Sequence, residues 1–241
     1  MQDLYILGHS TMARAFLKVL KNDYNIFIAT RSDTKNLNLI SYQDLNINDK
    51  IIILAFKPHD LAHIASFFKN QKAKIIISIL ASTSLDDIKN HFSASNITLA
   101  MPNLASEFKA SITPFISLND EFKDEIKAIL EHLGQIVELK NEKELKIASV
   151  LSGCTPAYLS LIADAFVMGG VLNGLSKDIA LDLTRGLFAS FATLLENNDP
   201  NDILYRVCSP GGISIKGIKE LEEKAIKATI IDALNSSLGS K

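Results

Sequence analysis

The sequence LYILGHSTMA, at residues 4–13, decides the fold predicted for the amino-terminal half of the chain. An apolar run of strand length, Leu4–Leu7, passes through Gly8 directly into a helical pattern. Further along, Ile51–Leu54 and Ile75–Ile77 are apolar at every position rather than at alternate positions. Such runs are typical of parallel strands that helices cover on both faces. We therefore predict a doubly wound α/β domain.

Short apolar runs alternate with helical patterns up to residue 140, and the pattern then changes. Strands are predicted at residues 4–7, 26–29, 51–56, 75–80, 97–100, 112–117 and 136–139. Helices are predicted between them at residues 12–20, 61–68, 85–92 and 122–133. Only long helical patterns follow, at residues 142–172, 177–196, 202–207 and 215–238. We therefore predict an α/β domain over residues 1–140 and an all-helical domain over residues 141–241.

The composition limits the classes of function that the chain can have. Its 241 residues are 47% hydrophobic and 22% charged, which is enough apolar sequence to bury one large or two moderate cores. A formal net charge of −2 gives no broad basic surface, so neither nucleic acid nor a membrane is expected as a partner. Two cysteines are too few for a disulfide framework, and no secretion signal is visible. We expect a folded protein of the cytoplasm.

One segment, Ser149–Leu175, is apolar enough to be mistaken for a membrane span. Asp164 is its one charged residue, but the segment also contains Pro156 and four glycines and has polar sequence close on both sides. We interpret it as a helix buried at a domain or subunit interface.

The loop after the first strand is a degraded form of the dinucleotide-binding pattern G-x-G-x-x-G/A. Gly8 and Ala13 match the pattern, but Ser10 stands in place of the middle glycine. The side chain of a serine leaves a pyrophosphate less room to approach the backbone. Its hydroxyl can, however, donate a hydrogen bond to the phosphate. Taken alone, the loop fits a nucleotide site and an ordinary strand-to-helix turn equally well. Its candidate cofactor contacts are Gly8, His9, Ser10, Thr11 and Met12.

The end of the second strand bears on the choice of cofactor. An NAD-preferring site usually has an acidic residue there, roughly 20 residues after the first glycine. This strand ends instead in Thr30, Arg31 and Ser32. The guanidinium of Arg31 can donate two hydrogen bonds to the oxygens of a 2′-phosphate, and Ser32 can add another. The sequence therefore favours NADPH, with NADH as the second choice, unless Arg31 is simply a solvated residue at a strand end.

Two further segments follow predicted strands at the edge where open α/β sheets bind ligands. Ala55, Lys57 and Pro58 come after the third long apolar strand and are candidate cofactor contacts. Asn103 comes after the fifth, in Met101-Pro102-Asn103, and is a candidate substrate contact. A proline at the start of a helix is also an ordinary structural feature, so these segments alone do not decide the function.

The carboxyl-terminal half contains a Ser-Pro-Gly-Gly turn at residues 209–212 that leads into a helix. Backbone N–H groups and the hydroxyls of Ser209 and Ser214 gather there around the positive end of a helix dipole. This arrangement suits a small carboxylate. The turn is therefore a candidate substrate site, and a plain glycine-rich helix start is the alternative.

In chain order, these segments resemble the pyrroline-5-carboxylate reductases, the enzymes that complete proline synthesis. The resemblance covers nearly the whole chain. Its segments are residues 8–13, 30–32, 55–58, 101–103, 151–158 and 209–218.

The resemblance implies a Rossmann-type domain that binds NAD(P)H, followed by a helical domain through which two subunits interlock. The substrate, 1-pyrroline-5-carboxylate, would lie between the nicotinamide and the loop at residues 209–214. Ser149 stands where the family usually has a threonine near the imine nitrogen, so it is the candidate for assisting protonation. By the same resemblance, the residues that hold the substrate carboxylate would be Ser209, Gly211, Gly212, Ile213 and Ser214.

The chain departs from the family pattern at several positions. Leu99 replaces a common arginine, Leu104-Ala105 replaces Thr-Pro, and Cys154-Thr155 replaces Ser-Gly. These changes bear on substrate range and rate more than on the fold. The reaction needs a hydride, a proton and correct alignment, so no metal is expected.

Two other classes of protein stay open on the sequence. One is another two-domain NADP-dependent reductase of the β-hydroxyacid dehydrogenase type, although the helix with paired glycine and lysine that such enzymes use is not visible. The other is a nucleotide-binding regulatory protein that has lost turnover, which the eroded loop at Gly8 would fit. The sequence favours the reductase of proline synthesis, as a homodimer or a larger ring of dimers.

Overall fold

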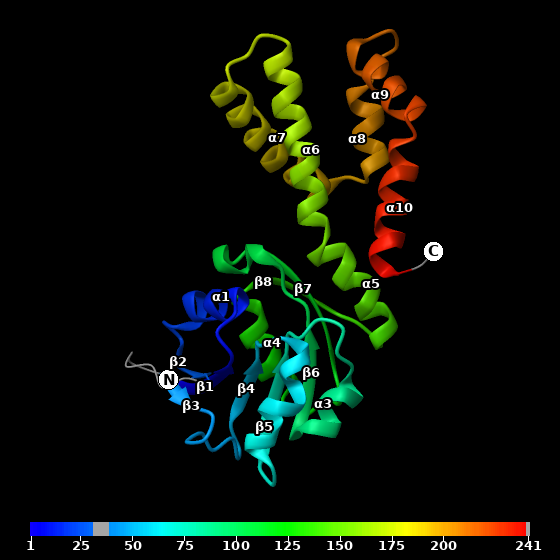
Figure 1. Ribbon diagram of the computed structural model, residues 1–241. Helices are drawn as coiled ribbons and strands as arrows, with labels where there is room; N and C mark the ends of the chain where they lie inside the picture. The colour runs from blue at the N-terminus through cyan, green and yellow to red at the C-terminus, as the bar shows by residue number, and fades with distance from the viewer. Residues whose placement is uncertain (31–38, 240–241) are drawn as a thin grey trace. The chain divides into compact units, whose positions relative to one another are not determined.

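The computed structural model describes residues 1–30 and 39–239 and divides the chain into two compact units, Met1–Gly153 and Cys154–Lys241 (Figure 1). The first unit includes helix α5 (Glu142–Gly153), which follows the domain boundary that we predicted after residue 140. The exact position of that boundary stays a prediction.

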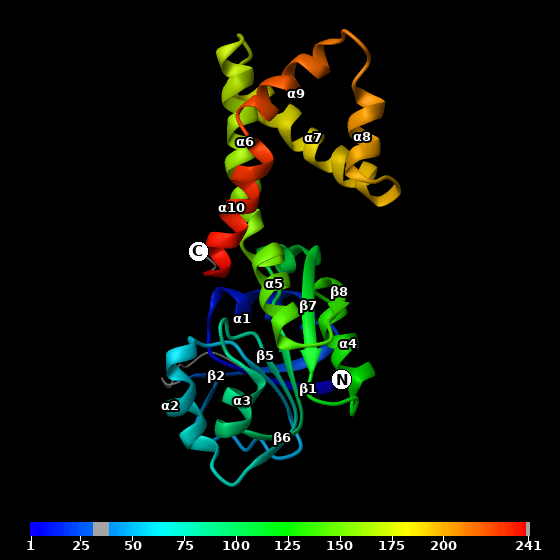
Figure 2. The same cartoon turned by 90° about the vertical axis from the view of Figure 1, so that its right-hand side faces the viewer.

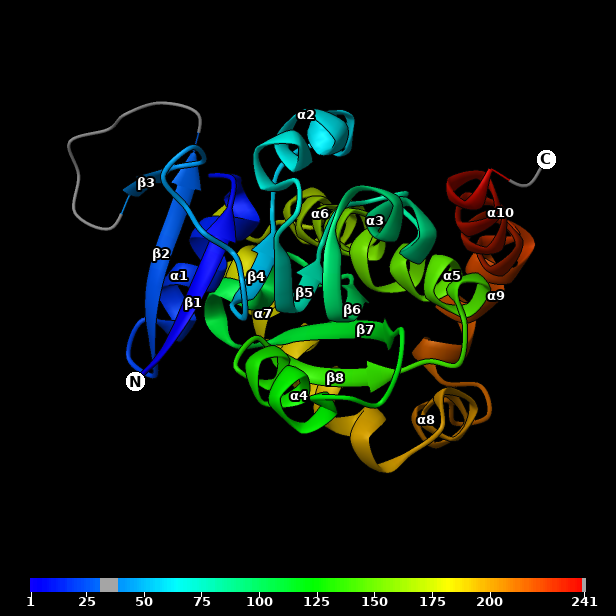
Figure 3. The same cartoon turned by 90° about the horizontal axis from the view of Figure 1, so that it is seen from below.

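The first unit is built on one eight-stranded sheet with the order β3-β2-β1-β4-β5-β6-β7-β8 (Figure 3). All neighbouring strands are parallel except β6 and β7. The strands are β1 (Gln2–Leu7), β2 (Tyr24–Thr30), β3 (Leu39–Ser41), β4 (Ile51–Leu54), β5 (Lys72–Ser78), β6 (Ser93–Ala100), β7 (Ser111–Ser117) and β8 (Gly134–Glu138). The predicted doubly wound α/β class is confirmed.

The sequence missed two features of this sheet. Strand β3 was not predicted, because three residues are too few to show a period. Strand β7 runs antiparallel to β6, against the parallel sheet that we expected. A parallel neighbour needs a crossover of a dozen or more residues, usually a helix. The short connection between β6 and β7 holds only the 3₁₀ helix η3 (Leu104–Phe108), so the chain turns back beside β6.

Helices cover both faces of the sheet, as the uninterrupted apolar strands require. Helices α1 (Thr11–Leu20) and α4 (Lys123–Glu131) contribute to one buried cluster, and α2 (Leu61–Ala65), α3 (Leu85–His91) and α5 contribute to the other. Between these clusters, all four residues of β4 are at most 2% exposed. Two short 3₁₀ helices, η1 (Pro58–Asp60) and η2 (Ser66–Phe68), flank α2.

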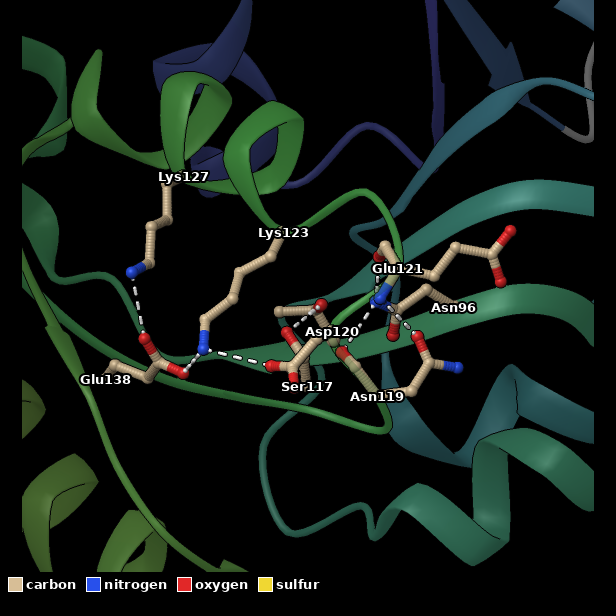
Figure 4. Close-up of polar contacts among 9 residues, drawn as sticks. Asn96, Ser117, Asn119, Asp120, Glu121, Lys123, Lys127 and Glu138 are labelled. Carbon is tan, nitrogen blue, oxygen red and sulfur yellow. Dashed lines mark hydrogen bonds and ion pairs between the residues drawn. The ribbon is translucent and has the colours of Figure 1, made fainter.

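A polar cluster ties α4 to β8 and to the turn after β7 (Figure 4). Lys123 and Lys127 of α4 both contact the carboxylate of Glu138 on β8, and Lys123 also contacts Asp120. The hydrogen bonds from Lys123 and then Lys127 hold the pKa of Glu138 below its usual value. The charges therefore stay paired at neutral pH.

Among the described residues of the second unit, every element of regular secondary structure is a helix, as predicted (Figure 2). Its helices are α6 (Thr155–Leu172), α7 (Lys177–Asn197), α8 (Pro200–Val207), α9 (Ile213–Glu223) and α10 (Ile226–Leu238). Two predicted helices are each divided in the structure. The first breaks at Cys154, just before Pro156, which cannot donate a helical hydrogen bond. The last breaks at Ala225, whose φ of 54° is left-handed.

Few apolar side chains of the second unit are buried within it. Among its described residues, the buried ones are Val167, Ala180 and Ile203, whereas Leu172 is 84% exposed. By length and apolar composition alone, the stretch Glu142–Leu172, which comprises α5 and α6, could also cross a membrane, and little of its most apolar part is buried. So much uncovered apolar surface indicates a partner for these helices.

Candidate functional site

Gly8 follows the carboxyl end of β1, a strand in the interior of the sheet. Its φ is +108°, and its N–H donates to the carbonyl of Ala29 at the end of β2 over 2.9 Å. A Cβ added to Gly8 would lie 2.6 Å from the carbonyl oxygen of Ala55, just after β4. Both the dihedral angle and the close approach therefore require glycine. The result is a narrow backbone turn between the end of β1 and the start of α1.

The turn opens directly into α1. Ser10 is the N-cap of this helix, and its Oγ accepts a hydrogen bond from the N–H of Ala13 over 3.2 Å. The side chains of His9 and Thr11 are exposed, and that of Met12 is partly exposed. The helix N-terminus is thus available to an anion, but the hydroxyl of Ser10 already satisfies one of its N–H groups.

Replacing Ser10 by glycine is expected to strengthen NADPH binding about fivefold, which corresponds to ~1 kcal/mol. The change frees the Ala13 N–H for a phosphate oxygen and removes a Cβ, while glycine replaces a serine cap at a cost of only a few tenths of a kcal/mol. Fluorescence titration with NADPH measures the effect. Ser10→Ala is the control, since it loses the hydroxyl but keeps the Cβ. Weaker binding in both variants would show that the hydroxyl donates to the cofactor.

The segment after β4 lies beside the Gly8 turn. The Ala55 N–H donates to the Leu7 carbonyl over 2.9 Å, and Ala55 is buried. Lys57 and Pro58 are exposed at the start of η1, where Lys57 is the N-cap. The strand order reverses between β1 and β4, and ligands of doubly wound sheets bind at such a switch point. The structure thus brings two of the predicted cofactor segments together.

Arg31 and Ser32 lie outside the described residues, and β2 is described up to its end at Thr30. Their role with the 2′-phosphate stays a prediction.

The structure adds Glu107, which the sequence did not single out, and places it beside Leu104, one of the departures from the family pattern. Leu104 and Glu107 of η3 line a hollow of about 250 Å³ together with Thr11 and Met12 of α1. Lys18 of α1 contacts the Glu107 carboxylate over 3.5 Å. Helix η3 therefore forms a wall next to the cofactor loop. The signal for η3 in the sequence was weak, because an Asn before a short turn is found in many loops.

Asn103 precedes η3 and uses both ends of its side-chain amide. Its Oδ1 accepts from the N–H of Ala105 over 2.9 Å, which caps η3. Its Nδ2 donates to the carbonyl of Ser152 in α5 over 3.1 Å. The structure places this predicted substrate contact within a network of backbone contacts.

Ser149, the candidate for assisting protonation, lies on the same helix α5. It is partly buried, and its Oγ donates to the carbonyl of Lys146 one turn earlier, over 2.8 Å. A hydroxyl held in this way keeps its lone pairs free to accept, and it can rotate toward another acceptor when one is present. Its role in the reaction stays a prediction.

The predicted carboxylate loop belongs to the second unit and forms a tight turn. The Gly212 N–H donates to the Ser209 carbonyl over 3.1 Å, Gly211 has a φ of +73°, and Pro210 precedes it. These features define a type II turn. Gly212 is the N-cap of α9 and has no side chain to satisfy the first N–H groups of the helix, at Ile213 and Ser214. The loop therefore offers unsatisfied donors to an anion.

Comparisons with known proteins agree with this division of the chain. A family model described as pyrroline-5-carboxylate reductase dimerisation matches residues 142–240. Another, described as NADP oxidoreductase, coenzyme F420-dependent, matches residues 3–82.

Individual relatives extend over both units. The pyrroline-5-carboxylate reductase of Helicobacter pylori strain J99 is 28% identical over 255 residues, covering 99% of this chain and 98% of the relative. That of Synechocystis is 32% identical over 194 residues, covering 78% of this chain and 72% of the relative. The crystal structure of the Plasmodium falciparum pyrroline carboxylate reductase with NADP bound superimposes with a TM-score of 0.88 at 25% identity. It covers 99% of this chain and 96% of the other.

Proposed function

This chain belongs to the pyrroline-5-carboxylate reductase family, and we propose that it reduces the cyclic imine 1-pyrroline-5-carboxylate to L-proline with NADPH, the last step of proline synthesis. The observation that carries the proposal is the similarity to these reductases over the full length of the chain. The Gly8 turn supports it independently, because it lies at the switch point of the sheet, where doubly wound folds bind their ligands, and because it has no room for a Cβ.

The reaction asks little of the protein beyond placement. When bound, NADPH supplies the hydride that adds to the imine carbon, and the ring nitrogen takes up a proton. The turn at Gly8 and the first N–H groups of α1 would hold the pyrophosphate of the cofactor, and Lys57 and Pro58 would be further contacts. Ser149 assists the transfer of this proton to the ring nitrogen. Holding the reacting atoms at short distance provides most of the rate enhancement.

The substrate carboxylate binds to the loop at residues 209–214. The donors are the N–H groups at the start of α9 and the hydroxyls of Ser209 and Ser214, assisted by the helix dipole. A carboxylate there gains charge-assisted hydrogen bonds from groups that have no helical partner. Arg31 and Ser32 bind the 2′-phosphate and so favour NADPH over NADH.

One assay tests the proposal. The purified protein is titrated with NADPH and NADH by fluorescence, and then supplied with 1-pyrroline-5-carboxylate while cofactor oxidation and proline formation are followed. Stoichiometric proline formation with tighter binding of NADPH supports the function. Cofactor binding without proline formation would favour either a reductase for another substrate or a regulatory nucleotide-binding protein.

The chain forms a homo-oligomer, since the matching family model is one of dimerisation. We assign it as a homodimer, or a ring of dimers, in the cytoplasm, with no nucleic acid or membrane as partner. The exposed apolar side chains of α6 and α7, among them Leu161, Leu172 and Leu183, provide the contact surface.

Light scattering at micromolar concentration is expected to give a mass of at least two chains. The helices leave too much apolar surface uncovered for a monomer to be stable in water. The double substitution Leu172→Glu and Leu183→Glu, which places charges on this surface, should lower the measured mass. A monomeric wild-type protein at this concentration would contradict the assignment.

A further inference from the structure

One side-chain amide joins the cofactor edge of the sheet to helix α5. Asn103 and Ser152 are 49 residues apart in sequence, yet Nδ2 of Asn103 lies 3.1 Å from the Ser152 carbonyl. The orientation of the amide is fixed by its partners. The Ala105 N–H requires an acceptor and the Ser152 carbonyl requires a donor. A flipped amide would lose both bonds.

On one side, Asn103 holds η3 against α1. Its Oδ1 caps η3, and its own carbonyl accepts from the hydroxyl of Ser106 over 2.6 Å. From η3, Phe108 places its ring 4.8 Å from the ammonium of Lys18 on α1. The position of Asn103 is therefore tied to the helix whose first turn faces the proposed cofactor phosphates.

On the other side, Asn103 holds the last turn of α5. Ser152 is 8% exposed, and the residue four positions after it is Pro156, which has no N–H to donate to the Ser152 carbonyl as a helix would require. Ser149 stands three residues earlier, on the same face of the helix. The hydrogen bond from Asn103 thus fixes the turn that carries the candidate proton donor.

A second bond anchors Asn103 to the sheet. Its backbone N–H donates to Oγ of Ser111 at the start of β7, over 3.1 Å, and Ser111 in turn contacts the hydroxyl of Thr113. Ser111 and Thr113 are at most 1% exposed. The backbone of Asn103 is therefore bonded to a buried, hydrogen-bonded strand, and this bond restricts the movement of the side-chain amide.

We propose that Asn103 is a positioning residue that sets the separation between the cofactor loop and Ser149, and that it does not hold the substrate. This differs from the substrate contact expected from the sequence, because both polar atoms of the side chain are engaged by backbone groups. The inference rests on the proposed reduction and on the role of Ser149 in it. Hydride and proton must reach one C=N bond together, so a displaced α5 slows the chemical step.

Asn103→Asp tests the proposal, since it removes one bond and keeps the other. Aspartate still caps η3 through an oxygen, but it has no N–H for the Ser152 carbonyl and repels it. We expect kcat to fall about tenfold, as for a small misplacement of reacting groups. The KM for 1-pyrroline-5-carboxylate and the Kd for NADPH should each change less than twofold. Hydrogen exchange of the α5 amides should become faster, and that of α1 should not.

Asn119→Asp is the matched control (Figure 4). Oδ1 of Asn119 accepts from the Glu121 N–H over 2.9 Å, and its Nδ2 donates to the Ser95 carbonyl over 3.0 Å. It therefore makes the same pair of bonds, but in the turn after β7, beside the Lys123 cluster. This variant should keep the wild-type kcat.

Three outcomes would overturn the proposal. A raised substrate KM with unchanged kcat in Asn103→Asp would show that the amide contacts the substrate. Equal losses of kcat in both variants would show a general effect on stability. If Asn103→Asp changes neither kcat nor the hydrogen exchange of the α5 amides, the bond from Asn103 to Ser152 does not position α5. Failure of the proposed function is seen separately, in a wild-type protein that forms no proline, and the positioning role falls with it.

Discussion

Gly8→Ala is expected to weaken NADPH binding at least 100-fold, or about 3 kcal/mol, and to destabilise the fold by a similar amount. The new Cβ would lie 2.6 Å and 2.8 Å from the carbonyl oxygen and carbon of Ala55. Both atoms belong to backbone at the end of a buried strand, so the Gly8 turn has to move instead. The φ of +108° adds strain for any L side chain. NADPH titration and thermal unfolding measure the two effects.

Gly174→Ala separates strain from steric conflict. Gly174 has a φ of +99°, close to that of Gly8, but an added Cβ meets nothing within 4 Å. This control should lose about 1 kcal/mol of stability and keep wild-type cofactor binding. Wild-type NADPH affinity in Gly8→Ala would mean that the cofactor does not use this turn.

Gly212→Val is expected to raise the KM for 1-pyrroline-5-carboxylate about 100-fold or to abolish turnover, an effect of ~3 kcal/mol. A Cβ at Gly212 would lie 2.6 Å from Oγ and 3.2 Å from the carbonyl oxygen of Ser209. The branched side chain would push apart the turn and cover the first N–H groups of α9. Steady-state kinetics measure the loss, and the Kd for NADPH should stay within twofold.

Gly217→Ala is the control for the second substitution. It lies further along α9, where an added Cβ meets nothing within 4 Å, so the helix should gain slightly in stability and the KM should not change. Equal losses of NADPH and substrate binding in Gly212→Val would mean that the loop at residues 209–214 has another role.

The sequence predicted those parts of the fold that depend on local patterns. Ile51–Leu54 is apolar at every position, and its burial on both faces follows directly. Gly8 could be placed because a strand leads straight into a helix around it. The break at Ala225 could not be predicted, because neither glycine nor proline marks it and alanine favours a helix.

The candidate site was predictable in its segments but not in its internal contacts. Gly8 and Ala55 each follow a predicted strand at the edge where open α/β sheets bind ligands, and that much could be predicted. The strand order that brings the two residues together is known from the structure. The bond from Asn103 to Ser152 joins distant parts of the chain, and its formation depends on how η3 and α5 pack. No local pattern at either residue encodes it.

The strand order has a consequence for how the protein is made. Strand β1 lies within the sheet, and β2 and β3 then extend one side of it while β4 to β8 extend the other in chain order. Each strand joins an edge that already exists, and none has to be inserted between two earlier ones. A chain that leaves the ribosome from its amino terminus can therefore assemble this sheet outward from β1 during translation. The helical unit emerges when that sheet is already complete. Its exposed apolar side chains can be covered only after a second chain has been made.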